Sequence, residues 1–245
     1  YEILRCLVGS EMCIRDRART LRMDRDTTSK KNSHEQILES FGRGDADILI
    51  GTQMIVKGHD FSRVTLVGVL LADLTLFSGD YRAGERTFDL LTQAAGRAGR
   101  GDVPGKVVIQ TYKPDNYAIT AAASQDYRAF YDIEEAYRSL MRYPPEWNMM
   151  VIMGTGMDEE QLANIMDRMY SLIRGKYINA GHLSVIGPSE PAISKIKDVY
   201  RRVLYIKHRD YRMLVDVKDY VEEWLKENGE NDVSVFFDLN PVNMY

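Results

Sequence analysis

Residues 93–100 read QAAGRAGR, and this run decides how the rest of the chain is interpreted. Arg97 and Arg100 are three positions apart, so they share one face of a helix or lie on the turn that ends it. Gly96 and Gly99 let the backbone come close to whatever the arginines hold. A planar guanidinium binds phosphate through paired hydrogen bonds and stays charged at any working pH. Such a pair meets the requirement of an arginine finger, although a run of this kind by itself is more often a flexible basic loop.

A second run lies upstream, where residues 51–61 read GTQMIVKGHDF directly after the apolar residues 48–50. Taken alone, Gly51–Thr52 is an ordinary turn and Lys57–Gly58 is a helix C-cap. Both runs occur in one chain, in this order, with a strand and a helix expected between them. Together they resemble motifs V and VI of superfamily 2 helicases, and their residues are most similar to those of the primosomal replication-restart helicases, the PriA family.

This resemblance implies a role for each run. Residues 18–125 would form the second of two RecA-like lobes that bind ATP and Mg²⁺ between them, with the phosphate loop and the Mg²⁺-binding acid on the first lobe. The resemblance makes Arg100 the arginine finger, Arg97 a second phosphate contact, and Gln93 a residue that orders the water or the arginines. The remaining residues implied are Gly51, Thr52, Gln53 and Lys57 on the DNA backbone, with Gly58 and Asp60 on the nucleotide side.

The hydrophobic pattern up to residue 111 predicts an α/β fold. Strand candidates at 20–23, 47–50, 64–71 and 106–111 alternate with helical stripes. This alternation is typical of a parallel sheet with helices on both faces. We expect both motifs at the carboxyl edge of the sheet, where open α/β sheets bind ligands.

The pattern changes after Pro144–Pro145, which stops a helical stripe within the connecting segment 126–145. Residues 146–245 then show a β-α-β-β-α-β order, which predicts a ferredoxin-like α+β domain. Within it, the stretch 195–212 carries seven basic residues and two acids, interleaved with tyrosines. Such a stretch suits the DNA backbone, with Arg201, Arg202 and Arg209 as candidates, or it is a solvated strand-loop-strand with the tyrosines half in the core.

Composition narrows the classes of function. The chain has 245 residues, 44% hydrophobic and 28% charged, as in a globular protein of one large or two ordinary domains. A net charge of −4 means that any DNA site must be local. No apolar run is as long as a membrane span, and Cys6 and Cys13 form no metal-binding pair. We expect a cytoplasmic protein without a membrane partner or a metal site, and the family resemblance alone implies that it is a monomer.

Residues 1–17 resemble a sequencing-adapter read-through found at the ends of unrelated proteins, and we expect them to be non-native; the alternative is a genuine amphipathic helix. The chain holds no G-x-x-x-x-G-K-[ST] phosphate loop, and no Asp-Glu-x-His-like acidic motif precedes Arg19. The cysteines of the family's zinc-binding insertion are also absent. We therefore expect half of an ATPase site, inactive alone.

The resemblance implies the C-terminal portion of an ATP-dependent 3′–5′ DNA helicase that acts in replication restart. Its expected partners are branched and single-stranded DNA, single-strand-binding protein and primosome components. One alternative is another superfamily 2 DNA translocase, against which the ferredoxin-like domain and the Asn240-Pro241 ending speak. The other is a non-catalytic DNA- or protein-binding module that uses a RecA-like lobe as a scaffold. Residues 80–86 also resemble a stretch of the family's sequence, and we assign them no role.

Overall fold

The computed structural model describes residues 18–28, 32–56, 61, 63–99, 104–177, 179, 181–229 and 232–244. The chain divides into two compact units. The first unit holds residues 1–76 and 85–127, and the second holds residues 77–84 and 128–245. Residues 77–84 therefore belong with the second unit, although they lie between two segments of the first.

Two parallel strand pairs form the first unit. β1 (Thr20–Met23) pairs with β2 (Ile48–Gly51), and α2 (Ser33–Arg43) connects them. β3 (Leu66–Val69) pairs with β4 (Lys106–Ile109). The predicted strands and their parallel direction are confirmed. No ladder joins the two pairs among the described residues, so the sheet is interrupted rather than continuous.

The helices of this part of the chain connect and flank the strand pairs. Two 3₁₀ helices follow β2 and β3, namely η1 (Gln53–Val56) and η2 (Ala72–Thr75). They are followed by α3 (Ala83–Ala95), α4 (Tyr117–Ser124) and α5 (Tyr127–Met141). α4 was not expected from the sequence. The side chain of Asn116 caps it by accepting a hydrogen bond from the Ala118 N–H at 3.0 Å.

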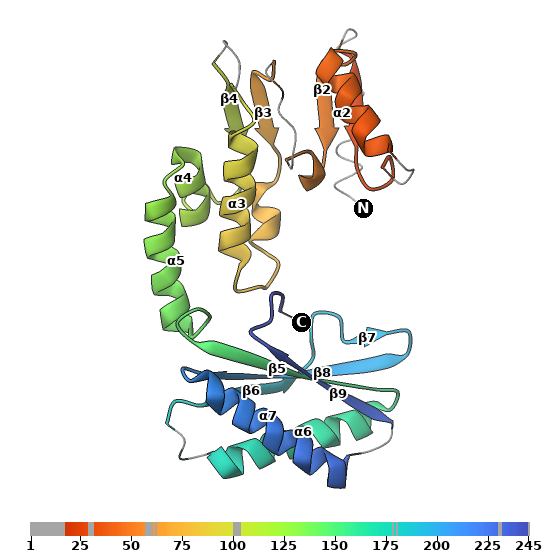
Figure 1. The fold of residues 1–245 in the computed structure, drawn as a ribbon, viewed down its shortest axis with the longest axis vertical. Helices are drawn as coiled ribbons and strands as arrows, with labels where there is room; N and C mark the ends of the chain where they lie inside the picture. The colour runs from red at the N-terminus through yellow and green to blue at the C-terminus, as the bar shows by residue number, and fades with distance from the viewer. Residues whose placement is uncertain are drawn as a thin grey trace. The chain divides into compact units, whose positions relative to one another are not determined.

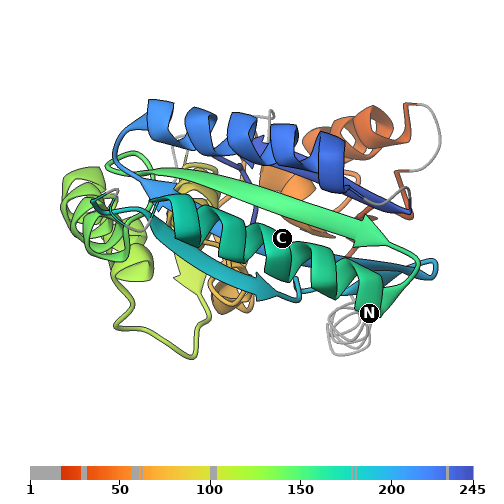
Figure 2. The same cartoon turned by 90° about the horizontal axis from the view of Figure 1, so that it is seen from below.

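The second unit is an antiparallel sheet with two helices on one face (Figures 1 and 2). Its strands lie in the order β6-β8-β5-β9, with the short β7 paired to β8. The elements are β5 (Asn148–Gly156), α6 (Glu159–Tyr177), β6 (Ser184–Ser189), β7 (Lys195–Ile196), β8 (Val199–His208), α7 (Tyr211–Asn228) and β9 (Val233–Leu239). This order and direction are those of a ferredoxin-like fold, so that prediction is confirmed, with β7 as an addition.

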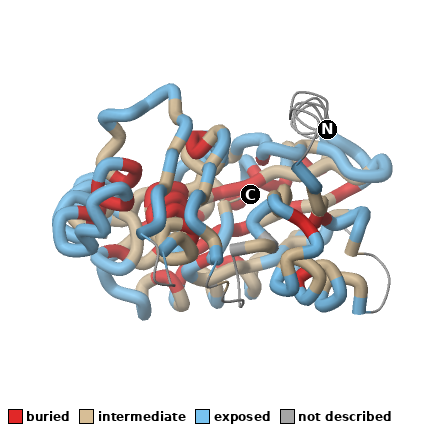
Figure 3. Tube along the Cα trace, turned by 90° about the horizontal axis from the view of Figure 1, so that it is seen from above, coloured by how far each residue is buried: buried red, intermediate tan, exposed pale blue. Residues whose placement is uncertain are grey.

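The core of this unit lies between the sheet and its two helices. Met150 and Ile152 of β5 face α6 and α7 because alternate residues of a strand point to one side. Gly154 continues that row, and a Cβ there would lie 2.6 Å from the sulfur of Met166. A larger residue at this position would therefore force the Met166 and Leu162 side chains of α6 to move. Each buried aliphatic side chain here contributes roughly 1.5–3 kcal/mol to folding, and Figure 3 shows where the buried stretches lie.

Residues 77–84 join the second unit through Tyr81. Its hydroxyl donates to the carbonyl oxygen of Pro241 at 3.0 Å, and its ring stacks on Tyr143 with centroids 5.1 Å apart. The guanidinium of Arg138 lies 5.6 Å from the Tyr81 ring centroid. Lys207 follows the same stack, with Nζ 3.6 Å from the Tyr143 centroid. Because Lys207 and Met150 face opposite sides of the sheet, this stack covers part of the helix-free face.

Candidate functional site

The first motif lies at the carboxyl end of β2, as expected. The strand ends at Gly51, where an added Cβ would fall on the carbonyl oxygen of Met23 and 2.9 Å from Ile55. Glycine is therefore required for the close passage past β1. Thr52 and Gln53 are exposed beyond this point, and the Thr52 carbonyl accepts from the Ile55 N–H at 3.1 Å to open η1.

A turn at the end of β1 lies beside this motif, and the sequence alone did not identify it. Asp24 is 5% exposed, and its Oδ1 accepts from the Thr27 N–H at 2.9 Å. That hydrogen bond is the largest cause that lowers the pKa of Asp24, and Arg22 adds to it. Since Met23 pairs with Gly51, the turn places the hydroxyl of Thr28 near the motif. An Asp followed by Thr at three and four positions is the signal of such a turn.

The second motif lies on the turn that follows α3. Gln93 is exposed on the last helical turn, and the Arg97 N–H donates to the Ala94 carbonyl at 3.1 Å. Gly99 adopts φ 71°, and its N–H donates to the Val64 carbonyl at 3.1 Å. A Cβ on Gly99 would lie 2.5 Å from the Gly105 nitrogen. Gly99 therefore closes a tight turn that holds the half-buried Arg97 in place.

The prediction that this second motif lies at the carboxyl edge of the sheet is wrong. Val64, which binds Gly99, precedes β3, and the Lys106 N–H that starts β4 donates to Thr65 at 2.8 Å. At the other end of β3, the hydroxyls of Thr75 and Thr87 lie 2.6 Å apart. Helix α3 therefore runs antiparallel to β3, and its end lies at the amino ends of β3 and β4. The motif follows helix α3 and not a strand, so it lies at the amino edge of this strand pair instead of the carboxyl edge.

Several expected site residues fall outside the described ranges. These are Lys57, Gly58, Asp60 and Arg100. Their assigned roles stay predictions.

The three arginines of the basic stretch do not share one face. Arg201 faces away from the helices, with its guanidinium 3.2 Å from the Ile193 carbonyl and from the Met153 sulfur. Arg202 pairs with Gly154 on the helix-bearing face and lies 3.9 Å from a carboxylate oxygen of Glu159. Arg209 is exposed beyond the end of β8. The stretch therefore does not form a single basic surface.

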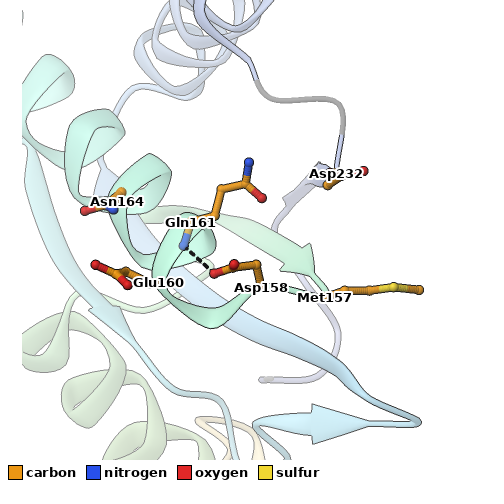
Figure 4. A pocket seen from close by; sticks show the side chains of 6 residues that line it. All are labelled: Met157, Asp158, Glu160, Gln161, Asn164 and Asp232. Atoms are coloured by element: carbon orange, nitrogen blue, oxygen red, sulfur yellow. Dashed lines mark hydrogen bonds between the residues drawn. The ribbon is translucent and has the colours of Figure 1, made fainter.

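A hollow of about 740 Å³ lies at the start of α6 (Figure 4). It is lined by Met157, Asp158, Glu160, Gln161, Asn164 and Asp232. Asp158 caps the helix, since its Oδ1 accepts from the Gln161 N–H at 2.9 Å. Three carboxylates at one opening repel phosphate, so this hollow does not suit a nucleotide or DNA.

The described ranges contain neither a membrane-spanning helix nor a metal-binding cluster. No helix there is long and apolar enough to cross a lipid bilayer. No group of three or more His, Cys, Asp or Glu side chains there is arranged to hold a metal ion.

Comparison with known families matches both units. Residues 6–102 match the model of the helicase conserved C-terminal domain, and residues 139–242 match that of the primosomal protein N C-terminal domain. The replication restart protein PriA of Bacillus subtilis is 42% identical over 229 residues, which cover 93% of this chain and 28% of that protein. The chain belongs to the PriA family.

Other PriA proteins give the same picture. That of Chlamydia trachomatis is 37% identical over 93% of this chain and 30% of its own length. That of Synechocystis sp. is 34% identical over 92% of this chain and 26% of its own. The chain thus spans less than a third of the PriA relatives that it matches. The two matched models assign it to their C-terminal part.

Proposed function

We propose that this chain is the second helicase lobe and the terminal domain of an ATP-driven DNA helicase that moves 3′ to 5′ and acts in replication restart. The observation that carries this proposal is the turn after α3. There Gly99 closes a tight turn after Arg97, and Gln93 is exposed one helical turn earlier. This arrangement suits a fixed guanidinium aimed at a phosphate.

The chain supplies the arginine side of an ATP site. Arg97 and Arg100 would neutralise charge on the transferred phosphoryl group, and Gln93 would order the attacking water or the arginines. Gly58 and Asp60 would link this site to bound DNA. ATP and Mg²⁺ also need a phosphate loop, which the sequence does not contain. The 245-residue chain alone is therefore inactive as an ATPase, and a first lobe completes the site.

DNA contact is assigned to the carboxyl ends of β1 and β2. Gly51, Thr52, Gln53 and Lys57 would hold the DNA backbone through N–H, hydroxyl and ammonium groups, which fix position without reading sequence. The expected ligands are branched and single-stranded DNA, and the expected protein partners are single-strand-binding protein and primosome components. The zinc that the resemblance implies would be bound by the family's cysteine-rich insertion, whose cysteines this sequence does not contain. A cytoplasmic monomer remains the expectation.

Turnover of ATP tests this proposal. In a full-length enzyme that contains this chain, Arg100→Ala should lower DNA-stimulated phosphate release by a factor on the order of 10³ while leaving DNA affinity nearly unchanged. Arg100→Lys should not restore activity, because a point charge does not reproduce the planar fork. The 245-residue chain should release no phosphate.

Arg128→Ala is the matched control, since that arginine is 82% exposed on α5 and pairs with Asp132 one helical turn away. Its activity should equal that of the unchanged enzyme. Near-normal turnover of Arg100→Lys would remove the finger assignment. Phosphate release by the 245-residue chain that disappears in Arg100→Ala would refute the half-site view, because a contaminant does not depend on that residue.

A further inference from the structure

A buried tryptophan and two arginines form a cluster where β5 begins and β8 ends. Trp147 is 5% exposed, although it lies just outside the first strand residue, Asn148. The guanidinium carbon of Arg142 lies 5.0 Å from the Trp147 ring centroid, and that of Arg209 lies 5.5 Å from the same centroid. Both guanidinium groups therefore lie on the same indole.

The sequence separation of these residues is bridged by the sheet. Asn148 pairs with His208, so extending the antiparallel register by one residue places Trp147 opposite Arg209. The Asn148 side chain fixes this corner by donating to the Arg209 carbonyl at 2.8 Å. The rings of His182 and Trp147 also pack edge to face, with ring centroids 6.4 Å apart. Contacts from the start of β5 and from the end of β8 therefore hold Trp147 and Arg209 together.

Arg142 occupies a backbone position that usually carries glycine. It ends α5 with φ 57°, and the Tyr143 N–H donates back to the Arg138 carbonyl at 2.8 Å. This is the left-handed C′ position of a helix, where glycine avoids a steric cost that other residues bear. An arginine bears that cost here, and its guanidinium lies on Trp147.

Neither arginine has a carboxylate partner. No ion pair involves Arg142 or Arg209 in the part of the chain that the structure describes, and both side chains are exposed. Close by, the buried Lys207 donates to the Met141 carbonyl at 3.2 Å and lies over the Tyr143 ring. Burial lowers the pKa of Lys207 to about 8, and the charge of Arg142 adds to that effect. These three basic residues outnumber the two carboxylates that adjoin Trp147 and Arg209 in the sequence.

We propose that Arg142 and Arg209, held on the indole of Trp147, bind the phosphodiester backbone of a nucleic-acid strand. An oxyanion supplies negative charge to these exposed groups, and a planar guanidinium suits its oxygens. A stacked guanidinium loses less side-chain freedom on binding than a free one. Because Trp147 is buried, the site reads the backbone and not the bases. This site rests on the DNA-binding role proposed above and locates it in the terminal domain.

Fluorescence anisotropy of a labelled single-stranded oligonucleotide with the 245-residue chain tests the site. Arg142→Gln with Arg209→Gln should weaken binding by on the order of tenfold at low salt. The slope of log affinity against log salt, measured from about 50 to 200 mM, should flatten by roughly 0.7 per lost phosphate contact. Fluorescence of Trp147 and Trp224 verifies that the variant is folded.

Arg168→Gln is the matched control. Arg168 lies 4.9 Å from the Trp224 ring centroid, so it is also an arginine on a tryptophan, but it donates to the Asn228 side chain at 3.3 Å. Its affinity and salt slope should equal those of the unchanged chain. An unchanged slope in the double variant would overturn the proposed site.

A second measurement separates a phosphodiester from free phosphate. The melting temperature of each chain is compared in inorganic phosphate and in chloride at equal ionic strength. If phosphate stabilises the unchanged chain but not the double variant, while both bind the oligonucleotide equally, the corner holds a free anion and the nucleic-acid assignment is wrong. ATP turnover of the full-length enzyme is a separate readout, so failure of this site and failure of the helicase proposal are distinguishable.

Discussion

At the scale of single residues, three side chains explain why a segment inside the helicase lobe sequence folds with the terminal domain. Tyr81 is 9% exposed, its ring stacks on Tyr143, and its hydroxyl donates to the Pro241 carbonyl. Arg138 lies over the same ring and is itself paired with the buried Glu134 at 2.7 Å. The local sequence pattern of residues 77–84 does not predict this packing, because each partner of Tyr81 is at least 57 residues away in the chain. From the sequence alone, residues 80–86 only resembled a stretch of the family's sequence.

Tyr81→Phe isolates the hydroxyl from the ring. The variant keeps the stack on Tyr143 but loses the hydrogen bond to the Pro241 carbonyl, which is buried. We expect the free energy of unfolding of the second unit to fall by about 1 kcal/mol. Both tryptophans lie in that unit, so urea unfolding followed by tryptophan fluorescence reports it. Tyr211→Phe, at an exposed position of α7, is the control and should be neutral; equal losses in both variants would contradict the role of the hydrogen bond.

At the scale of elements, the long amphipathic helices were predictable and the short, alanine-rich one was not. The apolar residues of α6 and α7 recur at helical spacing along one face, so the sequence predicts both helices. α4 has 8 residues, and its buried residues Ala118, Ile119, Ala121 and Ala122 contrast little in hydrophobicity with the exposed Ala123, so the sequence shows no clear apolar stripe. β7 has two residues, too few for any pattern. The edge of the sheet that carries Arg97 depends on the direction of α3, which periodicity does not reveal.

The contact between β8 and the end of α5 makes stability depend on pH. Lys207 is buried without a carboxylate partner, and its pKa is lowered from 10.5 to about 8. Below pH 8 the amino group is charged in both the folded and the unfolded chain, so the full cost of its burial is present. Between about pH 8 and 10.5 the folded chain binds fewer protons than the unfolded chain, and stability therefore rises with pH. Burial raises the pKa of Tyr143, which opposes this gain only above its ordinary value of 10.0.

Urea unfolding at pH values on either side of 8 measures this effect. From about pH 7.5 to 9.5, the unchanged chain should gain stability relative to Lys207→Met, in which the titrating group is gone. Lys218→Met serves as a second comparison, because that lysine is paired with Glu222 at 2.8 Å and has a raised pKa. It should keep the pH dependence of the unchanged chain. Parallel curves for the unchanged chain and Lys207→Met would show that the buried amino group is not the cause.

At the scale of the whole molecule, the terminal unit is larger than its ferredoxin-like core. The sheet, α6 and α7 contain the entire buried cluster that includes Met150, Ile165 and Leu204. The helix-free face, in contrast, is covered in part by side chains from before residue 146, namely Tyr81 and Tyr143, with the Met141 carbonyl on Lys207. Hydrophobic periodicity predicts the boundary of the ferredoxin-like core, because the core strands and helices carry the periodic pattern. It does not predict the residues that cover the helix-free face, because these lie on a turn and at the end of a helix.

Stepwise truncation separates the core from its cover. Residues 146–245 should fold alone, because the cluster between the sheet and the helices is complete in them. Residues 128–245 add Tyr143 and the Met141 carbonyl and should be more stable, by about 1 kcal/mol for one half-buried aromatic side chain. The 245-residue chain adds Tyr81 and should be the most stable of the three. Tryptophan fluorescence in urea follows the same unit in each. Equal stability of all three would mean that the stack on the helix-free face contributes nothing, whereas an unfolded 146–245 would mean that this face is part of the core.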